Sequence, residues 1–237
     1  MIPLYHDFTD ESVLVFGGGA VGARKASRFA DEARVVVVSP AFDDRLVDLA
    51  GEDDRNGRSD PGGANGPAVE LIRSAPDAAA VQGWIDRLDP ALVVAATDDA
   101  AVNAAAEAAA LDADLLVNRT DVSAAGQSGS RDARSVVVPA TVEDDPVRIA
   151  LSTGGASPAL AKALRERVEA EIDGAGAMAE LSGELRTDLK QRGIDPETRR
   201  AAIRRVVRSE GVWKGLQKGR ANGRQEAYSV IEEVLNR

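Results

Sequence analysis

The sequence contains no cysteine and a single histidine, His6, among its 237 residues. Without cysteine the chain can form neither a disulfide framework nor a thiolate nucleophile, and it lacks the clustered Cys and His ligands that structural zinc requires. A lone histidine this close to the start of the sequence is more typical of an incidental residue than of a catalytic base. The candidates for chemistry are therefore carboxylates, arginines and backbone groups.

Aromatic residues are also scarce, at 3% of the chain, although 44% of the residues are hydrophobic. The core must therefore consist of valine, leucine, isoleucine and alanine. No run of 18 apolar residues is present and no apolar targeting segment follows Met1. We therefore expect a cytoplasmic protein with no membrane partner. The length allows one large domain or two small ones.

Lysine is rare as well, with only five among the 29 basic residues, and the formal net charge is −10 with a pI near 4.8. Binding to a nucleic-acid backbone needs clustered cations, so this charge balance argues against nucleic acid as a general partner.

The first motif joins the apolar run at 12–16 to three glycines at the G-x-G-x-x-G spacing. A helical pattern and a second apolar run at 34–38 follow, which is the strand–turn–helix–strand context of a dinucleotide-binding turn. In such a turn the glycines allow a tight bend, a close approach of the pyrophosphate and close packing of the helix. The alternative is an ordinary strand–helix turn with extra glycines. We expect cofactor contacts from Gly17, Gly18, Gly19, Ala20, Val21 and Gly22.

Ribose recognition is predicted to be atypical. The position about twenty residues beyond the glycines usually carries an acid that binds the ribose hydroxyls, but here it is Ser39. Asp43 could reach the ribose from the start of the next helix, or it could be a solvated or capping acid. Arg45 is close to it, although no arginine stands directly at the strand end. We assign Ser39 and Asp43 to the cofactor site and favour NAD over NADP.

Apolar runs alternate with helical patterns as far as residue 121. We expect strands at 12–16, 34–38, 68–72, 91–96 and 115–117, and helices at 20–30, 77–88 and 100–111. This alternation predicts an α/β fold, a Rossmann-like doubly wound parallel sheet. Ligands bind at the carboxyl ends of strands in such sheets, so Thr97, Asp98 and Asn118 are further cofactor candidates. An acidic, glycine-rich stretch at 51–67 is predicted to be a surface loop.

Beyond residue 123 the pattern changes to a polar stretch and then to two short strands, expected at 135–140 and 147–151. Two strands alone are marginally stable, so a second copy of the chain is the simplest partner and we expect a homodimer. Helices follow at 158–172, 178–192, 196–208 and 225–235. We therefore expect an NAD-binding domain at 1–123, a dimerisation region at 124–156 and an all-helical domain at 157–237.

Several motifs in this order carry a family resemblance across residues 12–172. They are Gly-Gly-Gly-Ala-Val-Gly-Ala-Arg-Lys-Ala, Val-Val-Ser-Pro, Ala-Ala-Thr-Asp-Asp-Ala-Ala-Val-Asn, Val-Asn-Arg-Thr-Asp, Val-Val-Pro-Ala and Ser-Thr-Gly-Gly-Ala-Ser-Pro-Ala-Leu-Ala. With them the chain resembles the precorrin-2 dehydrogenase family, which includes the dehydrogenase and ferrochelatase half of siroheme synthase. The last motif is more unusual than the glycine turn. The polar stretch at 124–134 looks like an insertion relative to the family.

The resemblance implies oxidation of precorrin-2 to sirohydrochlorin with NAD⁺, and some members also insert Fe²⁺ into the product. The aspartate that the family uses, proposed as general base and linked to chelation, falls on Asp121. Asp121 is thus the one candidate metal contact, and no metal site is certain. Burial beside a large apolar macrocycle is expected to raise its pKa. Candidate partners for the carboxylates of the tetrapyrrole substrate are Arg119, Arg131, Arg134, Ser157, Lys162 and Arg165.

Two other functions fit parts of the sequence. A non-catalytic NAD-sensing module would also use a small Rossmann domain, but it would need neither the Asn118–Asp121 turn nor the helical tail. A short-chain oxidoreductase would normally carry a Tyr-x-x-x-Lys pair, and neither Tyr5 nor Tyr228 has a lysine four residues later. The dehydrogenase is therefore the preferred hypothesis.

Overall fold

The computed structural model describes residues 3–55, 69–122 and 132–236. The chain forms two compact units, Met1–Val138 and Pro139–Arg237. Most of the acidic stretch at 51–67 and most of the polar stretch at 124–134 fall outside the described residues. The three-part division expected from the sequence stays a proposal, and the structure groups the hairpin and the helical tail in one unit.

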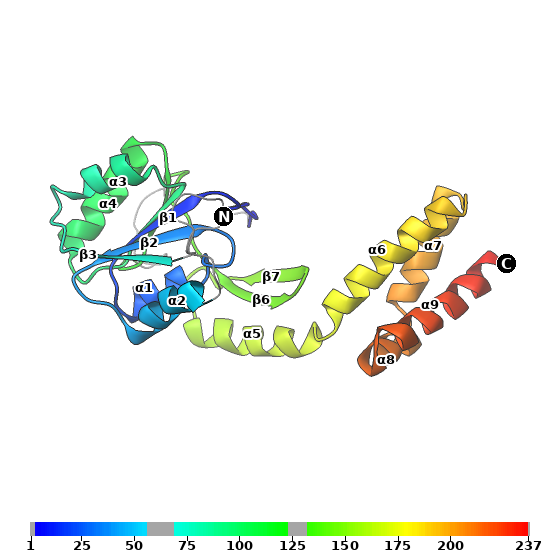
Figure 1. Ribbon diagram of the computed structural model, residues 1–237. Helices are drawn as coiled ribbons and strands as arrows, with labels where there is room; N and C mark the ends of the chain where they lie inside the picture. The colour runs from blue at the N-terminus through cyan, green and yellow to red at the C-terminus, as the bar shows by residue number, and fades with distance from the viewer. Residues whose placement is uncertain (1–2, 56–68, 123–131, 237) are drawn as a thin grey trace. The chain divides into compact units, whose positions relative to one another are not determined.

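The first unit is organised around a five-stranded parallel sheet with the strand order β3-β2-β1-β4-β5 (Figure 1). The strands are β1 (Ser12–Phe16), β2 (Arg34–Ser39), β3 (Val69–Arg73), β4 (Leu92–Ala95) and β5 (Leu116–Arg119). The order reverses between β1 and β4, which is the topological switch point where ligands bind in open α/β sheets. The predicted doubly wound, Rossmann-like sheet is confirmed.

Both faces of the sheet are covered by helices, so its central strands are apolar throughout. Val13 and Val15 pack into one core with α1 (Ala20–Ala26) and α2 (Asp44–Arg55). Leu14 and Phe16, which alternate with them along β1, pack into a second core with α3 (Val81–Leu88) and α4 (Ala100–Asp112). All four of these β1 side chains are fully buried. Because both faces are apolar, the strand is a continuous hydrophobic run, as in the sequence.

Two helices are shorter than the sequence predicts. The first, α1, ends at Ala26 and not at residue 30. The hydroxyl of Ser27 donates to the Ala23 carbonyl at 2.9 Å, and the next amides bond three residues back, with Phe29 N donating to Ala26 O at 3.0 Å. These tighter turns end the regular helix while Phe29 still reaches the core. Similarly, α3 begins at Val81, after a turn that starts near residue 77.

The hairpin begins later than predicted, so the expected strand at 135–140 is wrong. The segment after residue 134 instead lies along the outer edge of β5. The Val117 amide donates to Arg134 O at 3.0 Å, and the Val136 amide donates to Val117 O at 2.8 Å. The antiparallel hairpin consists of β6 (Ala140–Asp144) and β7 (Val147–Leu151). The apolar residues that the sequence pattern assigned to the first strand of the hairpin therefore pair with β5.

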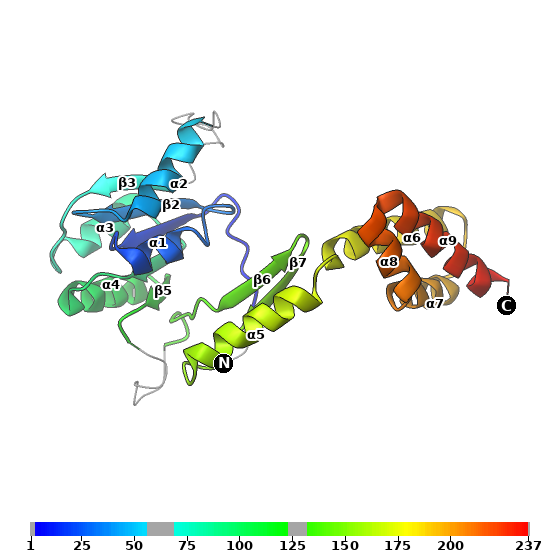
Figure 2. The same cartoon turned by 90° about the horizontal axis from the view of Figure 1, so that it is seen from below.

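The second unit contains this hairpin and a series of helices (Figure 2). The helix α5 (Pro158–Glu171) packs along the hairpin, and its N-cap Ser157 accepts from the Leu160 amide at 3.2 Å. Four more helices pack together around buried side chains such as Leu185 and Ile231. They are α6 (Ala175–Gln191), α7 (Pro196–Val207), α8 (Glu210–Lys218) and α9 (Arg220–Leu235). The sequence reading missed α8 and started α9 five residues late.

None of the helices in the described part of the chain is long and apolar enough to cross a lipid bilayer.

Candidate functional site

The carboxyl ends of β1, β2, β4 and β5 meet at one edge of the sheet. In register, Phe16 pairs with Val38 and with Ala95, and Ala95 pairs with Arg119. The backbone continues this pairing one residue further, since the Thr120 amide donates to Ala95 O at 3.0 Å. The candidate cofactor-binding and catalytic residues that follow these strands in the first unit therefore lie at the same edge.

The glycine turn between β1 and α1 is shaped by close backbone contacts. Gly17 has φ +110°, a conformation that side-chain-bearing residues rarely adopt, and its Cβ would overlap the carbonyl of Ala96. A Cβ on Gly22 would overlap the carbonyl oxygen of Gly17. Gly22 is thus required by the turn itself, and its nearest strand side chain, Val15, is 3.7 Å from that Cβ position. Gly17 allows the tight bend that the spacing predicts, whereas Gly22 packs mainly on the turn.

Gly19 differs from its neighbours because no atom lies within 4 Å of its Cβ position. This open space lies beside the start of α1, where Gly19 is the N-cap and Ala20 and Val21 follow as the first helical residues. The first N–H groups of a helix have no intrahelical partner and favour a negatively charged group. The turn therefore fits the pyrophosphate of a dinucleotide, with room on the Gly19 side.

The turn is tied to the next strand–helix connection by a backbone bond. The Asp43 amide donates to Gly18 O at 2.8 Å, and a Cβ on Gly18 would overlap the carbonyl of Ala41. Ser39, at the end of β2, is almost fully buried. The structure therefore places Ser39 and Asp43 beside the glycine turn, where the sequence predicts ribose recognition.

The carboxylate of Asp43 is already paired within the chain. Arg45 donates from Nε to Oδ1 at 2.9 Å and from its second terminal nitrogen to Oδ2 at 3.1 Å. These hydrogen bonds lower the pKa of Asp43 and raise the pKa of Arg45. Asp43 is thus an acid held by an arginine just before α2 begins, and not a solvated one. A ribose bound here would share the Asp43 carboxylate with Arg45.

The loop after β4 is held by a buried side chain, Asn103, that the sequence analysis did not single out. Its Oδ1 accepts from the Thr97 hydroxyl at 2.7 Å and from the Thr97 amide at 3.1 Å, and its amide nitrogen donates to Thr97 O at 2.9 Å. Asp99 caps α4 by accepting from the Ala101 amide at 2.8 Å, whereas Asp98 is exposed. Thr97 is therefore fixed at the sheet edge and Asp98 is free to face a ligand.

Asn118, near the end of β5, has one satisfied group and one that lacks a partner. Its side-chain nitrogen donates to Val136 O at 2.8 Å. Its Oδ1 is buried and has no hydrogen-bond partner among the described residues. Leaving a buried acceptor unpaired costs about 1–3 kcal/mol, so such an atom calls for a donor from a bound molecule. The amide of a nicotinamide ring is a donor of the right kind.

An ion-pair cluster, defined by Glu107, Arg119 and Asp121, lies beyond the end of β5. Arg119 donates from Nε to Asp121 Oδ1 at 2.8 Å and from a terminal nitrogen to Oδ2 at 3.1 Å. Its other terminal nitrogen donates to Glu107 Oε2, on α4, at 3.0 Å. Only 20% of the Arg119 side chain is exposed, so these bonds are shielded from water more than ordinary surface pairs are.

This cluster controls the ionisation of Asp121. The hydrogen bonds from Arg119 are the largest cause of a lowered Asp121 pKa, partial burial opposes them, and a bond from Asn103 lowers the pKa further. Pairing with Asp121 in turn raises the pKa of Arg119. The expected rise in pKa beside a bound macrocycle stays a prediction; without the macrocycle, the hydrogen bonds from Arg119, which the sequence pattern did not show, outweigh the effect of burial.

The remaining candidates lie elsewhere. Arg134 forms a bidentate pair with Asp114, with Nε 2.7 Å from Oδ1. In the second unit, α5 carries Lys162, whose Nζ is 3.9 Å from Glu166, and Arg165, which donates to Glu169 at 2.9 Å. Such exposed i,i+4 pairs are weak and leave both cations available to a ligand. Arg131 lies outside the described residues.

In the part of the chain that the structure describes, no three His, Asp or Glu side chains come together as a metal site would require. Arg119 pairs with both Asp121 and Glu107 and so lies between these two acids.

Comparison with known proteins places the chain in a family. A family described as "Putative NAD(P)-binding" matches residues 4–146, and one described as "Sirohaem biosynthesis protein central" matches residues 144–171. Precorrin-2 dehydrogenase of Methanosarcina barkeri is 29% identical over 237 residues, covering 99% of this chain and 95% of the relative. Siroheme synthase of Tolumonas auensis is 34% identical over 201 residues, which is 84% of this chain but only 36% of that protein.

Among solved structures, "SirC, precorrin-2 dehydrogenase" has the same fold, with a TM-score of 0.65 at 22% identity over 98% of this chain and 100% of that chain. The class of protein is thus a dinucleotide-binding α/β protein with a helical extension. The chain belongs to the putative NAD(P)-binding family and is a homologue of precorrin-2 dehydrogenases and siroheme synthases.

Proposed function

We propose that the chain oxidises precorrin-2 to sirohydrochlorin with NAD⁺ as hydride acceptor. The observation that carries this proposal is the position of an ionised carboxylate, Asp121, at the same sheet edge as the glycine turn. The near full-length similarity to the M. barkeri precorrin-2 dehydrogenase supports it.

The reaction removes one hydride and one proton from adjacent carbon atoms of the reduced tetrapyrrole and leaves a double bond between them. When bound, NAD⁺ supplies the acceptor for the hydride. Asp121 takes the proton, and a base can do so only in its ionised form. The lowered pKa of Asp121 keeps the carboxylate ionised throughout the neutral range, so the base is ready before the substrate arrives.

The other residues at the edge hold the reactants. Thr97 and Asn118 present polar atoms beside the glycine turn, and the unpaired Oδ1 of Asn118 accepts from the cofactor amide. Arg119 orients Asp121 through two parallel hydrogen bonds, and Glu107 holds Arg119 from the other side. This is a positioning role, because a bidentate pair fixes the plane of the carboxylate. Such preorganisation is the main contribution of protein groups to hydride transfer.

For the substrate we propose contacts from Arg119, Ser157, Lys162 and Arg165. Arg119 already has two carboxylate partners, so it would bind a substrate carboxylate only by sharing its remaining donors. Lys162 and Arg165 have only weak surface pairs and exchange them for substrate carboxylates at little cost.

Homodimer formation is a further part of the proposal. It is supported by α5, which buries none of its residues within the chain and exposes 51% of Leu160. A partner covering α5 and the neighbouring hairpin would bury this surface. Light scattering of the purified chain tests this point, and a monomer mass at micromolar concentration would remove it. Insertion of Fe²⁺ remains a prediction from the family resemblance, tested by supplying iron with sirohydrochlorin.

The proposed activity is tested by mixing the purified chain with precorrin-2 and NAD⁺ at a salt concentration where it is folded. We expect NADH and sirohydrochlorin to form in equal amounts. NAD⁺ binding is measured on the same sample by calorimetry. Binding without turnover would favour the NAD-sensing alternative, whereas neither binding nor turnover would contradict both hypotheses.

A further inference from the structure

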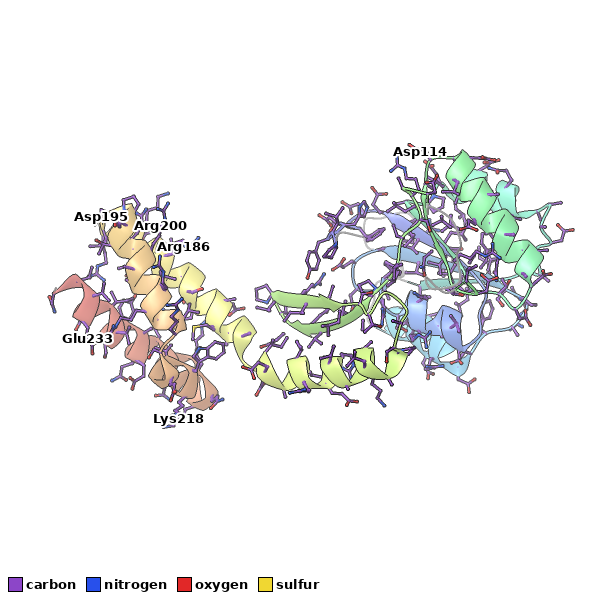
Figure 3. The ribbon with its side chains drawn as sticks, turned by 180° about the vertical axis from the view of Figure 1, so that it is seen from behind. Asp114, Arg186, Asp195, Arg200, Lys218 and Glu233 are labelled. Atoms are coloured by element: carbon purple, nitrogen blue, oxygen red, sulfur yellow. The ribbon has the colours of Figure 1, made fainter. Side chains whose placement is uncertain are left out.

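The helices α6 and α7 of the second unit line an open pocket of about 480 Å³ that is dominated by arginine. We call it the arginine pocket, and its lining residues are Arg186, Pro196, Arg199, Arg200, Ile203 and Arg204. Figure 3 shows the labelled Arg186 and Arg200 on these two neighbouring helices, with Asp195 at the start of α7. All of these residues belong to one compact unit.

The spacing of the lining residues explains how the pocket forms. Residue 196 and the adjacent pairs 199/200 and 203/204 recur at intervals of three or four positions, so they lie along one stripe of α7. Ile203, which is 9% exposed, belongs to both the pocket and the helical core and forms an apolar floor. Arg186 projects from α6 to the same space. The result is an apolar base with guanidinium groups around it.

Acids in the described part of the chain do not neutralise these arginines. Among the described residues, none of the four forms an ion pair with a carboxylate, and Arg199 donates only to the carbonyl of Ile194, at 3.1 Å. Two nearby arginines outside the pocket are paired, Arg205 with Glu233 at 3.3 Å and Arg192 with Asp188 at 3.7 Å.

The acid closest in sequence is also engaged elsewhere. Asp195 caps α7, and its Oδ1 accepts from the amides of Glu197 and Thr198, both at 3.0 Å. In a chain with a net charge of −10, four arginines that converge without an acid are an exception to the general charge pattern. Gathering like charges is unfavourable unless an anion offsets their repulsion.

We propose that the arginine pocket binds a small organic polyanion whose acid groups are carboxylates or phosphates. Planar guanidinium groups pair with both kinds of oxyanion through two parallel hydrogen bonds. The volume lies within the range of small-molecule sites, about 300–1,000 Å³, and exceeds what a single inorganic phosphate needs. Several guanidinium groups around an apolar floor match a ligand with several acid groups on an organic skeleton.

The test is calorimetric titration of the full chain in the presence of saturating NAD⁺, so that the glycine turn is occupied. The probes are citrate, a polycarboxylate porphyrin, inorganic triphosphate and polyglutamate. The variants are Arg186→Gln, Arg200→Gln and Arg200→Lys. Arg208→Gln is the matched control, because Arg208 is exposed just beyond α7 and does not line the pocket. Melting temperatures establish that each variant is folded.

Binding of the carboxylate probes or of triphosphate, weakened about tenfold by Arg186→Gln and by Arg200→Gln, supports the proposal and identifies the preferred acid group. Arg200→Lys is expected to weaken binding less than Arg200→Gln, because lysine keeps the charge but loses the planar fork. Arg208→Gln should leave binding unchanged. The proposal is overturned if no small probe binds, if the control weakens binding as much as the pocket variants, or if only polyglutamate binds.

Discussion

The glycine turn after β1 and the ion-pair cluster after β5 lie at the same edge of the sheet, but the turn is formed by backbone atoms and the cluster by side chains. The turn is formed by backbone, with Gly17 and Gly22 packed against main-chain carbonyls. The cluster is formed by side chains, with Arg119 held between Glu107 and Asp121. A backbone site suits a group common to many ligands, such as a pyrophosphate, and cannot titrate. A side-chain site can be adjusted in charge and orientation, which is what a proton transfer needs.

A substitution at a packed glycine of the turn is predicted to destabilise the chain through steric overlap. Gly22→Ala places a Cβ on the carbonyl oxygen of Gly17, so we expect the free energy of unfolding to fall by about 3 kcal/mol and NAD⁺ binding to weaken. Gly83→Ala in α3 is the control, because its Cβ meets no atom within 4 Å and should stabilise the chain by about 0.5–1 kcal/mol. Denaturant unfolding of both variants measures the difference. Equal stability of the two variants would contradict the proposed role of Gly22.

In the ion-pair cluster, by contrast, a substitution is predicted to act by changing the pKa of Asp121. Asp121 acts as a base only above its pKa, and Arg119 lowers that pKa, so the acid limb of the rate profile lies at low pH in the native chain. Arg119→Met removes the fork and leaves Asp121 near Glu107, which raises the pKa of Asp121. We therefore expect the acid limb of kcat/KM to move to higher pH.

Glu107→Gln is the matched variant for this measurement. It removes one partner of Arg119 and keeps the two hydrogen bonds to Asp121, so the shift of the acid limb should be smaller. Superimposable pH profiles for the native chain and Arg119→Met would show that the cluster does not set the protonation of the base.

The smallest expected effect concerns cofactor choice at the turn. Asp43→Ala releases Arg45 from its bidentate pair, and a free arginine at this position favours the 2′-phosphate of NADP⁺. We expect the ratio of NADP⁺ to NAD⁺ affinity to rise by about tenfold. Asp44→Ala, one residue further along, is the control and should leave the ratio unchanged. No change in Asp43→Ala would mean that this pair does not face the ribose.

The same contrast explains what the sequence could predict. The glycine turn depends on residues close together in the chain, and its spacing was sufficient to locate it. The cluster depends on Glu107 and Arg119, which are 12 positions apart and lie on different elements. No local pattern joins them. Asn103 was detectable in principle, because a polar residue inside an alanine-rich helix indicates a buried hydrogen bond, and its amide group holds Thr97.

Strand prediction has the same limit, because a local pattern does not show which distant segments pair. The apolar alternation of β1, β2 and β4 follows from burial on both faces, so those strands were predicted almost to the residue. The apolar residues from 136 to 138 have an equally good strand pattern, but the backbone around Val136 pairs with the edge of β5 instead of with β7. Which edge a short apolar segment joins is decided by tertiary pairing, and a propensity pattern does not contain that information.

The most direct test of the division between turn and cluster compares Gly19→Val with Asp121→Asn. Gly19 has open space at its Cβ position and an extended backbone, so valine should fold there and obstruct the pyrophosphate. We predict that Gly19→Val weakens NAD⁺ binding at least about tenfold with kcat little changed. Asp121→Asn should lower kcat by about 100- to 10,000-fold with NAD⁺ affinity unchanged. If both variants altered the same parameter, or if Asp121→Asn retained the native kcat, the division between a cofactor-binding turn and a proton-accepting cluster would be contradicted.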